Sequence, residues 1–248
     1  MVAVKSMEKE FEGKEILLKI LLVGEPAVGK TSLLQRYVKG VFTSQYRSTI
    51  GTDFAMKIIR LADDLQVRIQ FWDLAGQERF GSQIKAYFRE ADGALCVCDA
   101  IRPATREKAL DWKKLIQQNS TNQQGQHIEP ECFLIINKID LLEAAYKKQA
   151  ATDESFYEDD ASTNNVDPEQ MKATCERMAK QTGFFDGAVV SAKDGSGVND
   201  VILKFVKHLV HLKLNAQQFD DVHDNDLIKL GYDPEAVLTP AKRWWNPC

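Results

Sequence analysis

The sequence predicts an α/β fold in which helices cover both faces of a mostly parallel, doubly wound β-sheet. Short apolar runs alternate with amphipathic helical segments along the chain, and a glycine-rich loop joins the first run to the first helix. Strands that alternate with helices at this spacing require right-handed crossovers between parallel neighbours. Two adjacent strand-like runs with only a short turn between them add one antiparallel strand to that sheet.

The first strand, loop and helix carry the strongest local pattern. Leu17–Val23 is an apolar strand, and Ser32–Lys39 is an amphipathic helix that ends before Gly40. The loop between them is Gly24-Glu25-Pro26-Ala27-Val28-Gly29-Lys30-Thr31. It matches a pattern in which backbone N–H groups are presented to the phosphates of a nucleotide, a lysine reaches the β- and γ-phosphates and a hydroxyl holds Mg²⁺. A glycine turn in another α/β protein also fits this pattern alone.

A hairpin follows. Asp53–Leu61 and Leu65–Trp72 are strand-like, and Ala62-Asp63-Asp64 suits the turn between them. Helix-like residues around Ile84–Glu90 then lead into a buried strand, Ala94–Asp99.

The second half repeats the alternation. Thr105 is placed to cap a helix with Ala109, Trp112, Leu115 and Ile116 on one face. Two short strands follow, Cys132–Ile136 and Ala188–Val190. A helix capped by Asp167, with Pro168 at its first position, runs to near Gly183. A last helix has apolar residues at three-and-four spacing through Val201–Val210.

These elements divide the chain into a charged leader (1–16), one domain (17–213) and a tail (214–248). Within the domain, residues 143–166 form a polar, acidic insertion that we expect to be disordered, with a binding loop as the alternative. The tail, like the leader, is expected to be a flexible appendage.

Composition excludes several classes of protein. A net charge of −4 and the absence of a basic run argue against a nucleic-acid binder. The five cysteines indicate buried thiols of a reducing compartment, and the four histidines lie too far apart for a zinc pattern. No signal peptide or bilayer-spanning run is evident, so we expect a cytosolic protein.

Three further motifs follow strand ends, where ligands of such sheets bind. In the run 72–78, Asp73 can hold Mg²⁺ directly or through water, Gly76 lets its N–H approach the γ-phosphate, and Gln77 can orient a water. A buried Asp140, in Asn137-Lys138-Ile139-Asp140, would pair with N1–H and the exocyclic amine of guanine but be left unpaired by adenine, at a cost of about a few kcal/mol. A backbone N–H of Ser191-Ala192-Lys193 can meet the guanine oxygen.

Together these motifs resemble those of the Ras superfamily of small GTPases, over about Leu17 to Leu212. Tyr46–Phe54 and Gly76–Phe80 are similar to its Rab branch; Gly81, Leu74 and the run 54–57 resemble the Rabs of lysosome-related organelles. The resemblance implies a three-layer P-loop NTPase G domain with six strands and two switch segments that are ordered by GTP and loosened by GDP.

The resemblance also implies roles for individual residues. Thr31 would bind Mg²⁺ in both states and Thr49 only with GTP, Phe42 would pack on guanine, and Gln77 would be the catalytic glutamine. The implied contacts to GTP or GDP are Gly24, Ala27, Val28, Gly29, Lys30, Thr31, Ser32, Phe42, Tyr46, Thr49, Gly76, Asn137, Lys138, Asp140, Ser191, Ala192 and Lys193, with Thr31, Thr49 and Asp73 toward Mg²⁺.

The implied partners are an exchange factor, a GTPase-activating protein and effectors that dock on Phe54, Trp72 and Tyr87, with Ile50 beside them. Partly exposed sheet aromatics are the structural alternative for that trio. Through these effectors the protein would regulate vesicle trafficking at the cytosolic face of endolysosomal or other membranes.

Two departures from the Rab pattern keep an alternative open. Pro26 stands where most Rabs have a small residue, and proline has no backbone N–H. The N–H groups of Ala27 to Ser32 can still bind the phosphates, but the rate of hydrolysis is expected to be altered. Cys248 is a lone terminal cysteine, where Rabs usually carry two prenylated ones. It is either a single lipidation site, which would give reversible membrane association, or a plain terminal cysteine with no role. The alternative is a cytosolic, weakly hydrolysing, GTP-bound scaffold.

Overall fold

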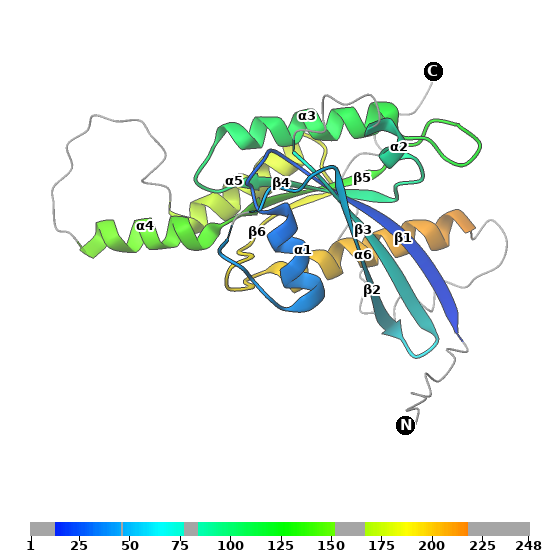
Figure 1. The fold of residues 1–248 in the computed structure, drawn as a ribbon, viewed down its shortest axis with the longest axis horizontal. Helices are drawn as coiled ribbons and strands as arrows, with labels where there is room; N and C mark the ends of the chain where they lie inside the picture. The colour runs from blue at the N-terminus through cyan, green and yellow to red at the C-terminus, as the bar shows by residue number, and fades with distance from the viewer. Residues whose placement is uncertain (1–12, 46, 77–83, 152–166, 218–248) are drawn as a thin grey trace, which may run out of the picture.

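A computed structural model describes residues 13–45, 47–76, 84–151 and 167–217 of the chain. In this part the strands form one sheet in the order β2-β3-β1-β4-β5-β6, and only β2 and β3 pair antiparallel (Figure 1). The predicted mostly parallel sheet is therefore confirmed. The strands are β1 (Lys14–Val23), β2 (Thr52–Ala62), β3 (Leu65–Leu74), β4 (Gly93–Asp99), β5 (Glu131–Asn137) and β6 (Asp186–Val189).

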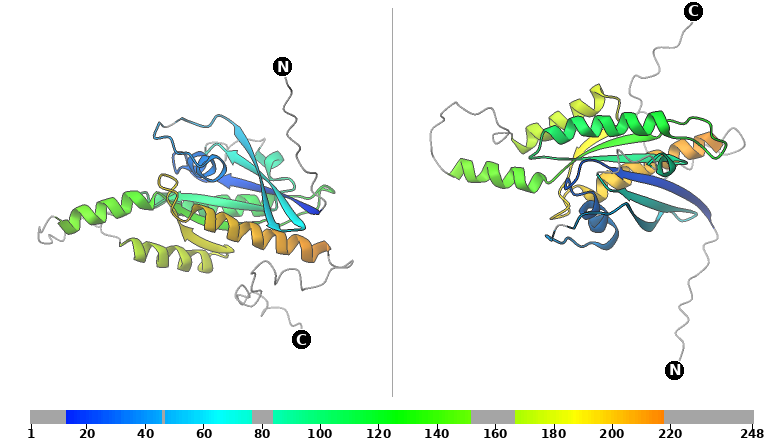
Figure 2. Two further views of the ribbon diagram at one scale, coloured as in Figure 1. Left: turned by 90° about the horizontal axis from the view of Figure 1, so that it is seen from below. Right: turned by 45° about the horizontal axis from the view of Figure 1, so that its top comes forward.

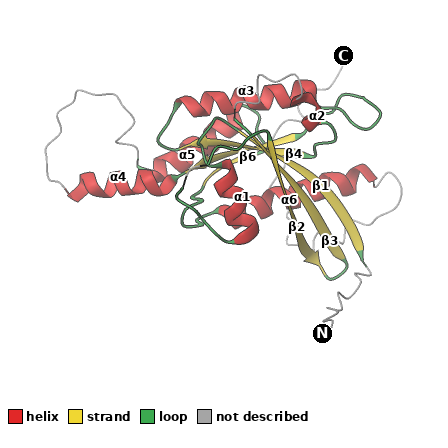
Figure 3. Ribbon diagram, in the orientation of Figure 1, coloured by secondary structure: helices red, strands yellow, loops and turns green. Residues whose placement is uncertain are grey.

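Helices cover both faces of the sheet, as predicted (Figures 2 and 3). One core cluster packs α1 and α6 against the sheet, and a second packs α2, α3, α4 and α5 against the other face. β1 serves both clusters, since Leu22 belongs to the first and Leu21 to the second. The helices are α1 (Lys30–Lys39), α2 (Ile84–Phe88), α3 (Ala104–Asn119), α4 (Ile139–Ala151), α5 (Pro168–Gln181) and α6 (Val198–Gln217).

The acidic insertion is not wholly irregular. Its first residues, 143–151, continue α4, which projects beyond the sheet in Figure 1. Disorder was therefore the wrong expectation for this part; residues 152–166 lie outside the described residues. The helix forms because Ile139 and Leu142 in its first turn are buried in the second core cluster.

The helix caps agree with the sequence at one site and differ at another. Asp167 caps α5 by accepting a hydrogen bond from the Glu169 N–H at 3.0 Å, as expected. Thr105 does not cap α3, which begins at Ala104; its hydroxyl instead accepts from the Asp99 N–H at 2.9 Å and donates to the Arg102 carbonyl. Thr105 therefore closes the turn after β4.

The domain is slightly longer than the sequence pattern indicated. β1 begins at Lys14 rather than Leu17, because residues 14–16 pair with β3, and α6 continues to Gln217. Among the described residues, no helix has the length and hydropathy needed to cross a membrane. The four described cysteines are buried free thiols, as expected: Cys96, Cys98, Cys132 and Cys175.

Candidate nucleotide-binding site

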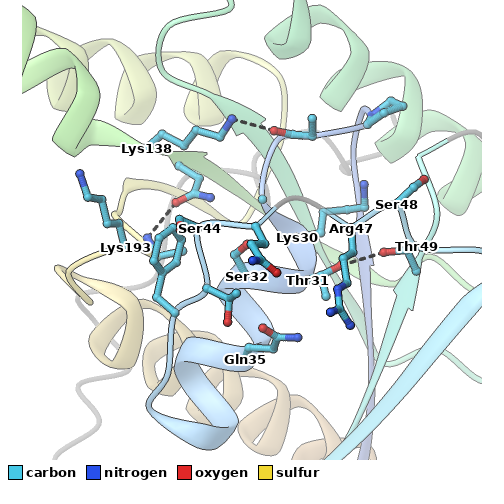
Figure 4. A pocket seen from close by; sticks show the side chains of 18 of the residues that line it. Lys30, Thr31, Ser32, Gln35, Ser44, Arg47, Ser48, Thr49, Lys138 and Lys193 are labelled. Carbon is cyan, nitrogen blue, oxygen red and sulfur yellow. Dashed lines mark hydrogen bonds between the residues drawn. The ribbon is translucent and has the colours of Figure 1, made fainter.

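A pocket of about 630 Å³ lies at the carboxyl ends of the central strands (Figure 4). Lys138 and Lys193 lie at one end of it, and Thr31 and Thr49 at the other. Most of the residues that the sequence assigned to a nucleotide line this pocket: Ala27, Gly29, Lys30, Thr31, Ser32, Phe42, Thr49, Gly76, Asn137, Lys138, Asp140, Ala192 and Lys193. Segments far apart in the chain thus meet in one cavity.

The backbone of the loop between β1 and α1 follows a path that favours glycine. Gly24 and Gly29 have φ angles of +144° and +94°, in the range that L side chains rarely adopt. A Cβ at Gly24 would lie 2.1 Å from the Val97 carbonyl oxygen, and one at Gly29 would lie 2.4 Å from Asn137 Nδ2. Both glycines are therefore required by close packing behind the loop as well as by conformation.

The carbonyl groups of this loop are held by side chains. Lys30 Nζ donates to the Gly24 and Glu25 oxygens at 2.9 and 3.1 Å. The next three carbonyls, of Pro26, Ala27 and Val28, accept hydrogen bonds from Arg102, Lys138 and Asn137 at 3.0, 2.7 and 2.9 Å. With its carbonyls taken, the loop has N–H groups to offer an anion, which is the arrangement of a phosphate-binding nest.

Asp99 connects two of these donors. Its buried Oδ2 accepts from Lys138 Nζ at 2.8 Å and from Arg102 Nε at 2.9 Å. Sequence reasoning assigned no role to Asp99 or Arg102, because nothing local indicates that the end of β4 reaches the loop after β1. The only usable signal was the position of Asp99 at a strand end, the edge where ligands bind in such sheets.

Lys30 and Asp73 have strongly shifted pKa values. Burial lowers the pKa of Lys30 to about 8, although the nearby Asp73 carboxylate opposes the shift. Burial also raises the pKa of Asp73 to about 6, against the hydrogen bond from Thr31 and the charge of Lys30. A buried cation and a buried carboxylate side by side are typical of a functional site.

The residues assigned to Mg²⁺ fit that ion. Thr31 Oγ1 donates to Asp73 Oδ2 and lies 2.9 Å from Thr49 Oγ1. Asp73 Oδ1 is buried and has no hydrogen-bond partner among the described residues. Two hydroxyls and an unpartnered buried carboxylate oxygen form the hard oxygen donor set that Mg²⁺ prefers.

The base end of the pocket differs from the expectation in two respects. Asp140 is not fully buried, since 13% of its side chain is exposed, and it accepts from Ser191 Oγ at 2.8 Å. The N–H groups of Ser191 and Ala192 donate to the Ser196 carbonyl and to Asn137 Oδ1, both at 3.0 Å. Those two N–H groups are thus engaged by the protein, and Ser191 contributes its hydroxyl to Asp140 instead.

Some expected residues lie behind the pocket wall or outside the described chain. Gly24, Val28, Asp73 and Ser191 do not line the cavity; Tyr46, Gln77 and Cys248 lie outside the described residues. The pocket also includes residues to which the sequence assigned no nucleotide contact, among them Gln35, Ser44, Arg47 and Ser48. Gln35 was detectable in principle, because it follows Thr31 by one helical turn on α1.

Gly76 packs directly against Pro26. A Cβ at Gly76 would lie 2.4 Å from the Pro26 nitrogen and 2.7 Å from Pro26 Cδ. The segment after β3 therefore approaches the loop after β1 at the proline, and a side chain at position 76 would clash with Pro26.

The predicted aromatic trio is assembled on the surface. The Phe54 and Trp72 rings meet edge to face at 5.5 Å, and Tyr87 lies 6.1 Å from Trp72. Phe54 is half exposed, and Ile50 is 94% exposed. Exposed apolar groups next to a ligand site are typical of a docking surface.

Comparison with known proteins gives concordant results. The model of the Ras family matches residues 19–211. The chain is 33% identical to the human Ras-related protein Rab-32, over 93% of this chain and 90% of that protein. It is 41% identical to Rab-32A of Dictyostelium discoideum, over 82% and 83% of the two chains, and 32% identical to human Rab-7L1, over 79% and 84%.

Proposed function

This chain belongs to the Ras family of small GTPases, with Rab proteins as its relatives, and from that premise we propose that it is a Rab-type switch in membrane trafficking. It is a GTPase that binds guanine nucleotides. Its GTP state would present the switch segments to effectors, and hydrolysis to GDP would end that interaction.

The observation that carries this proposal is the fixed phosphate loop. Its consecutive carbonyls are held by Lys30, Arg102, Lys138 and Asn137, so its N–H groups are directed to an anion before any ligand arrives. Preorganised donors of this kind stabilise charge on transferring phosphoryl groups without reorganisation. The buried Lys30 ammonium adds a cation at the same place.

Mg²⁺ would be held by Thr31, Thr49 and Asp73, where it would neutralise charge on the phosphate oxygens. Thr49 comes from the segment after α1 and Thr31 from α1 itself, so an ion that engages both would link the two segments. The role of Gln77 in orienting water follows from the family motif.

Base discrimination would depend on Asp140. Its carboxylate faces the pocket, supported by Ser191 Oγ at 2.8 Å and by Lys193 Nζ at 3.7 Å. Guanine offers two donors to such a carboxylate and adenine does not. Phe42, which is partly exposed and lines the pocket, would pack on the base.

The effector surface would be Phe54, Trp72 and Tyr87 with Ile50. The support is the ring contacts of Trp72 with Phe54 and Tyr87, and the exposure of Phe54 and Ile50. An exchange factor and an activating protein are the other partners of such a switch. Cys248 would provide a reversible lipid anchor, on the cytosolic face of an endolysosomal or other intracellular membrane.

The proposal is tested on the full chain. The purified protein should carry GDP or GTP, and GDP with Mg²⁺ should raise its melting temperature while ATP does not. Retention of neither nucleotide, with no thermal shift, would contradict it. Affinity capture on GTP-loaded and GDP-loaded protein, with trafficking effectors expected on the former, tests the switch.

Two measurements separate the switch from the scaffold alternative. Single-turnover hydrolysis, with and without an activator, is compared between the natural chain and Pro26→Ser, and membrane fractionation is done in the native cell. Negligible turnover together with a purely cytosolic distribution would support the scaffold. Pro26→Ser should bind nucleotide normally, because the N–H groups from Ala27 onward are retained.

A further inference from the structure

Arg36 on α1 donates hydrogen bonds to three backbone carbonyls in two separate loops. Its Nε donates to the Ala192 oxygen at 2.9 Å and its Nη1 to the Gly40 oxygen at 2.8 Å, while Nη2 donates to the Lys193 oxygen. All three acceptors are main-chain atoms. A planar guanidinium presents its donors as a rigid fork and so fixes the angles between the carbonyls it serves, whereas an ammonium has three donors at the end of a flexible stem.

Both loops belong to the base end of the nucleotide pocket. Ala192 and Lys193 line the cavity directly, and Gly40 precedes Phe42, which lines it from the other segment. In Figure 1 the loop that leads into α6 lies against α1. Arg36 itself does not line the pocket, so it acts on the pocket through the two backbones.

The side chains of Ser191 and Lys193 attach the loop of Ala192 to Asp140, and its backbone is held by fewer contacts. Within it, Ser191 N–H donates to the Ser196 carbonyl and Gly195 N–H donates to the Ser191 carbonyl, so these bonds close the loop on itself. Both backbone groups of Ala192 bind residues outside the loop: its N–H donates to Asn137 Oδ1, and its carbonyl accepts from Arg36. Loss of Arg36 removes the hydrogen bond to the Ala192 carbonyl.

Packing supports the same arrangement. Arg36 Cδ would lie 3.5 Å from a Cβ at Gly195, whose φ is +93°. The Arg36 stem thus covers the turn of the loop while its guanidinium binds the preceding carbonyls. This contact spans 156 positions of sequence between Arg36 and Ala192.

We infer that Arg36 is a positioning residue that controls the rate of guanine-nucleotide release by holding the two loops of the base pocket together. This inference rests on the proposed nucleotide function and identifies where release of the nucleotide is regulated. A base that leaves by displacing the segment of Ala192 and Lys193 would break the hydrogen bonds from Arg36 to their carbonyls. Hydrolysis of bound GTP should not depend on Arg36, because among the described residues its side chain donates only to carbonyls of the two base-pocket loops.

The test uses the full chain loaded with a fluorescent GDP analogue in Mg²⁺, with excess unlabelled GDP as the chase. Arg36→Ala should release the analogue roughly ten- to hundredfold faster, the equivalent of one or two charge-assisted hydrogen bonds. Its single-turnover rate of GTP hydrolysis should stay within about twofold of the natural chain. A merely structural defect would change both rates together.

Arg36→Lys keeps the charge and the folded stem, and should give an intermediate release rate, since one ammonium replaces the guanidinium fork. Arg89→Ala is the matched control, because Arg89 donates to the Gln123 carbonyl far from the pocket and should leave release unchanged. A lysine that restores the natural rate would assign the effect to charge alone and overturn the inference.

Two failures are distinguishable. Tight GDP binding by the natural chain, with an equally slow release from Arg36→Ala, would refute the role of Arg36 and leave the nucleotide function intact. Absence of GDP binding by the natural chain would refute the function first. If Arg36→Ala fails to fold, the lysine variant alone decides, and a release rate equal to that of the natural chain counts against the inference.

Discussion

The buried carboxylate of Asp99 provides the sharpest prediction for stability. Asp99 is 1% exposed, and its Oδ2 accepts from Lys138 Nζ at 2.8 Å and Arg102 Nε at 2.9 Å, while Oδ1 accepts from the Ile101 N–H at 3.1 Å. Asp99→Asn removes the negative charge. Depending on the orientation of the amide, the two cations then face either its NH₂ group or its one remaining oxygen. Both cations then lose the carboxylate that holds them beside the phosphate loop.

The expected loss of stability depends on how deeply Asp99 and its two cationic partners are buried. Removal of one member of a fully buried ion pair costs about 3–5 kcal/mol. The side chains of Arg102 and Lys138 are 44% and 29% exposed, so water compensates them in part. We therefore expect Asp99→Asn to lower the free energy of unfolding by about 2–3 kcal/mol.

Asp111→Asn is the matched control, because Asp111 forms an exposed pair with Lys108 at 3.2 Å on α3. Such a pair contributes about 0.5 kcal/mol or less. Urea denaturation at a fixed concentration of GDP and Mg²⁺ measures both variants, and the dissociation constant of GDP, determined separately, allows the binding contribution to be subtracted. If the corrected costs of the two variants agree within about 0.5 kcal/mol, the reasoning from burial is wrong.

Three other substitutions are expected to act on separate steps. Asp140→Asn should weaken GDP binding roughly 30- to 1,000-fold and favour xanthosine diphosphate, which offers an acceptor where guanine has an amine; a competition assay measures this. Gly76→Ala places a methyl group 2.4 Å from the Pro26 nitrogen, so single-turnover hydrolysis should fall by about tenfold or more while GDP affinity changes little; unaltered hydrolysis would contradict the close contact. Burial raises the pKa of Tyr37 from 10.0 to about 12; since the folded value is the higher one, the stability contributed by its neutral phenol is complete below pH 10 and is lost as the pH rises to about 12. Urea denaturation of Tyr37→Phe should lack that decline, and a parallel decline in both proteins would refute it.

Local patterns were sufficient for the sheet and for the ligand motifs. Apolar runs around β1, β4 and β5 are buried on both faces, so their strand character is visible in any short window. The nucleotide motifs are contiguous runs whose spacing is set by backbone geometry, as at Gly24 and Gly29. Periodicity failed for residues 143–151, because their helix is anchored by Ile139 and Leu142, which precede the polar stretch.

By itself, then, the sequence determined the strands, the helices other than α4 and the loop after β1, since each depends on neighbours within a few residues, and it proposed Asp140 as the carboxylate that would recognise the base. The tertiary structure alone decided which side chains hold those motifs in place. Arg102 reaches Pro26 across 76 positions and Arg36 reaches Ala192 across 156, and no local pattern encodes such partners. A cation on a helix or a strand end is compatible with many positions in space, and only the packing of the sheet selects the carbonyl to which it donates.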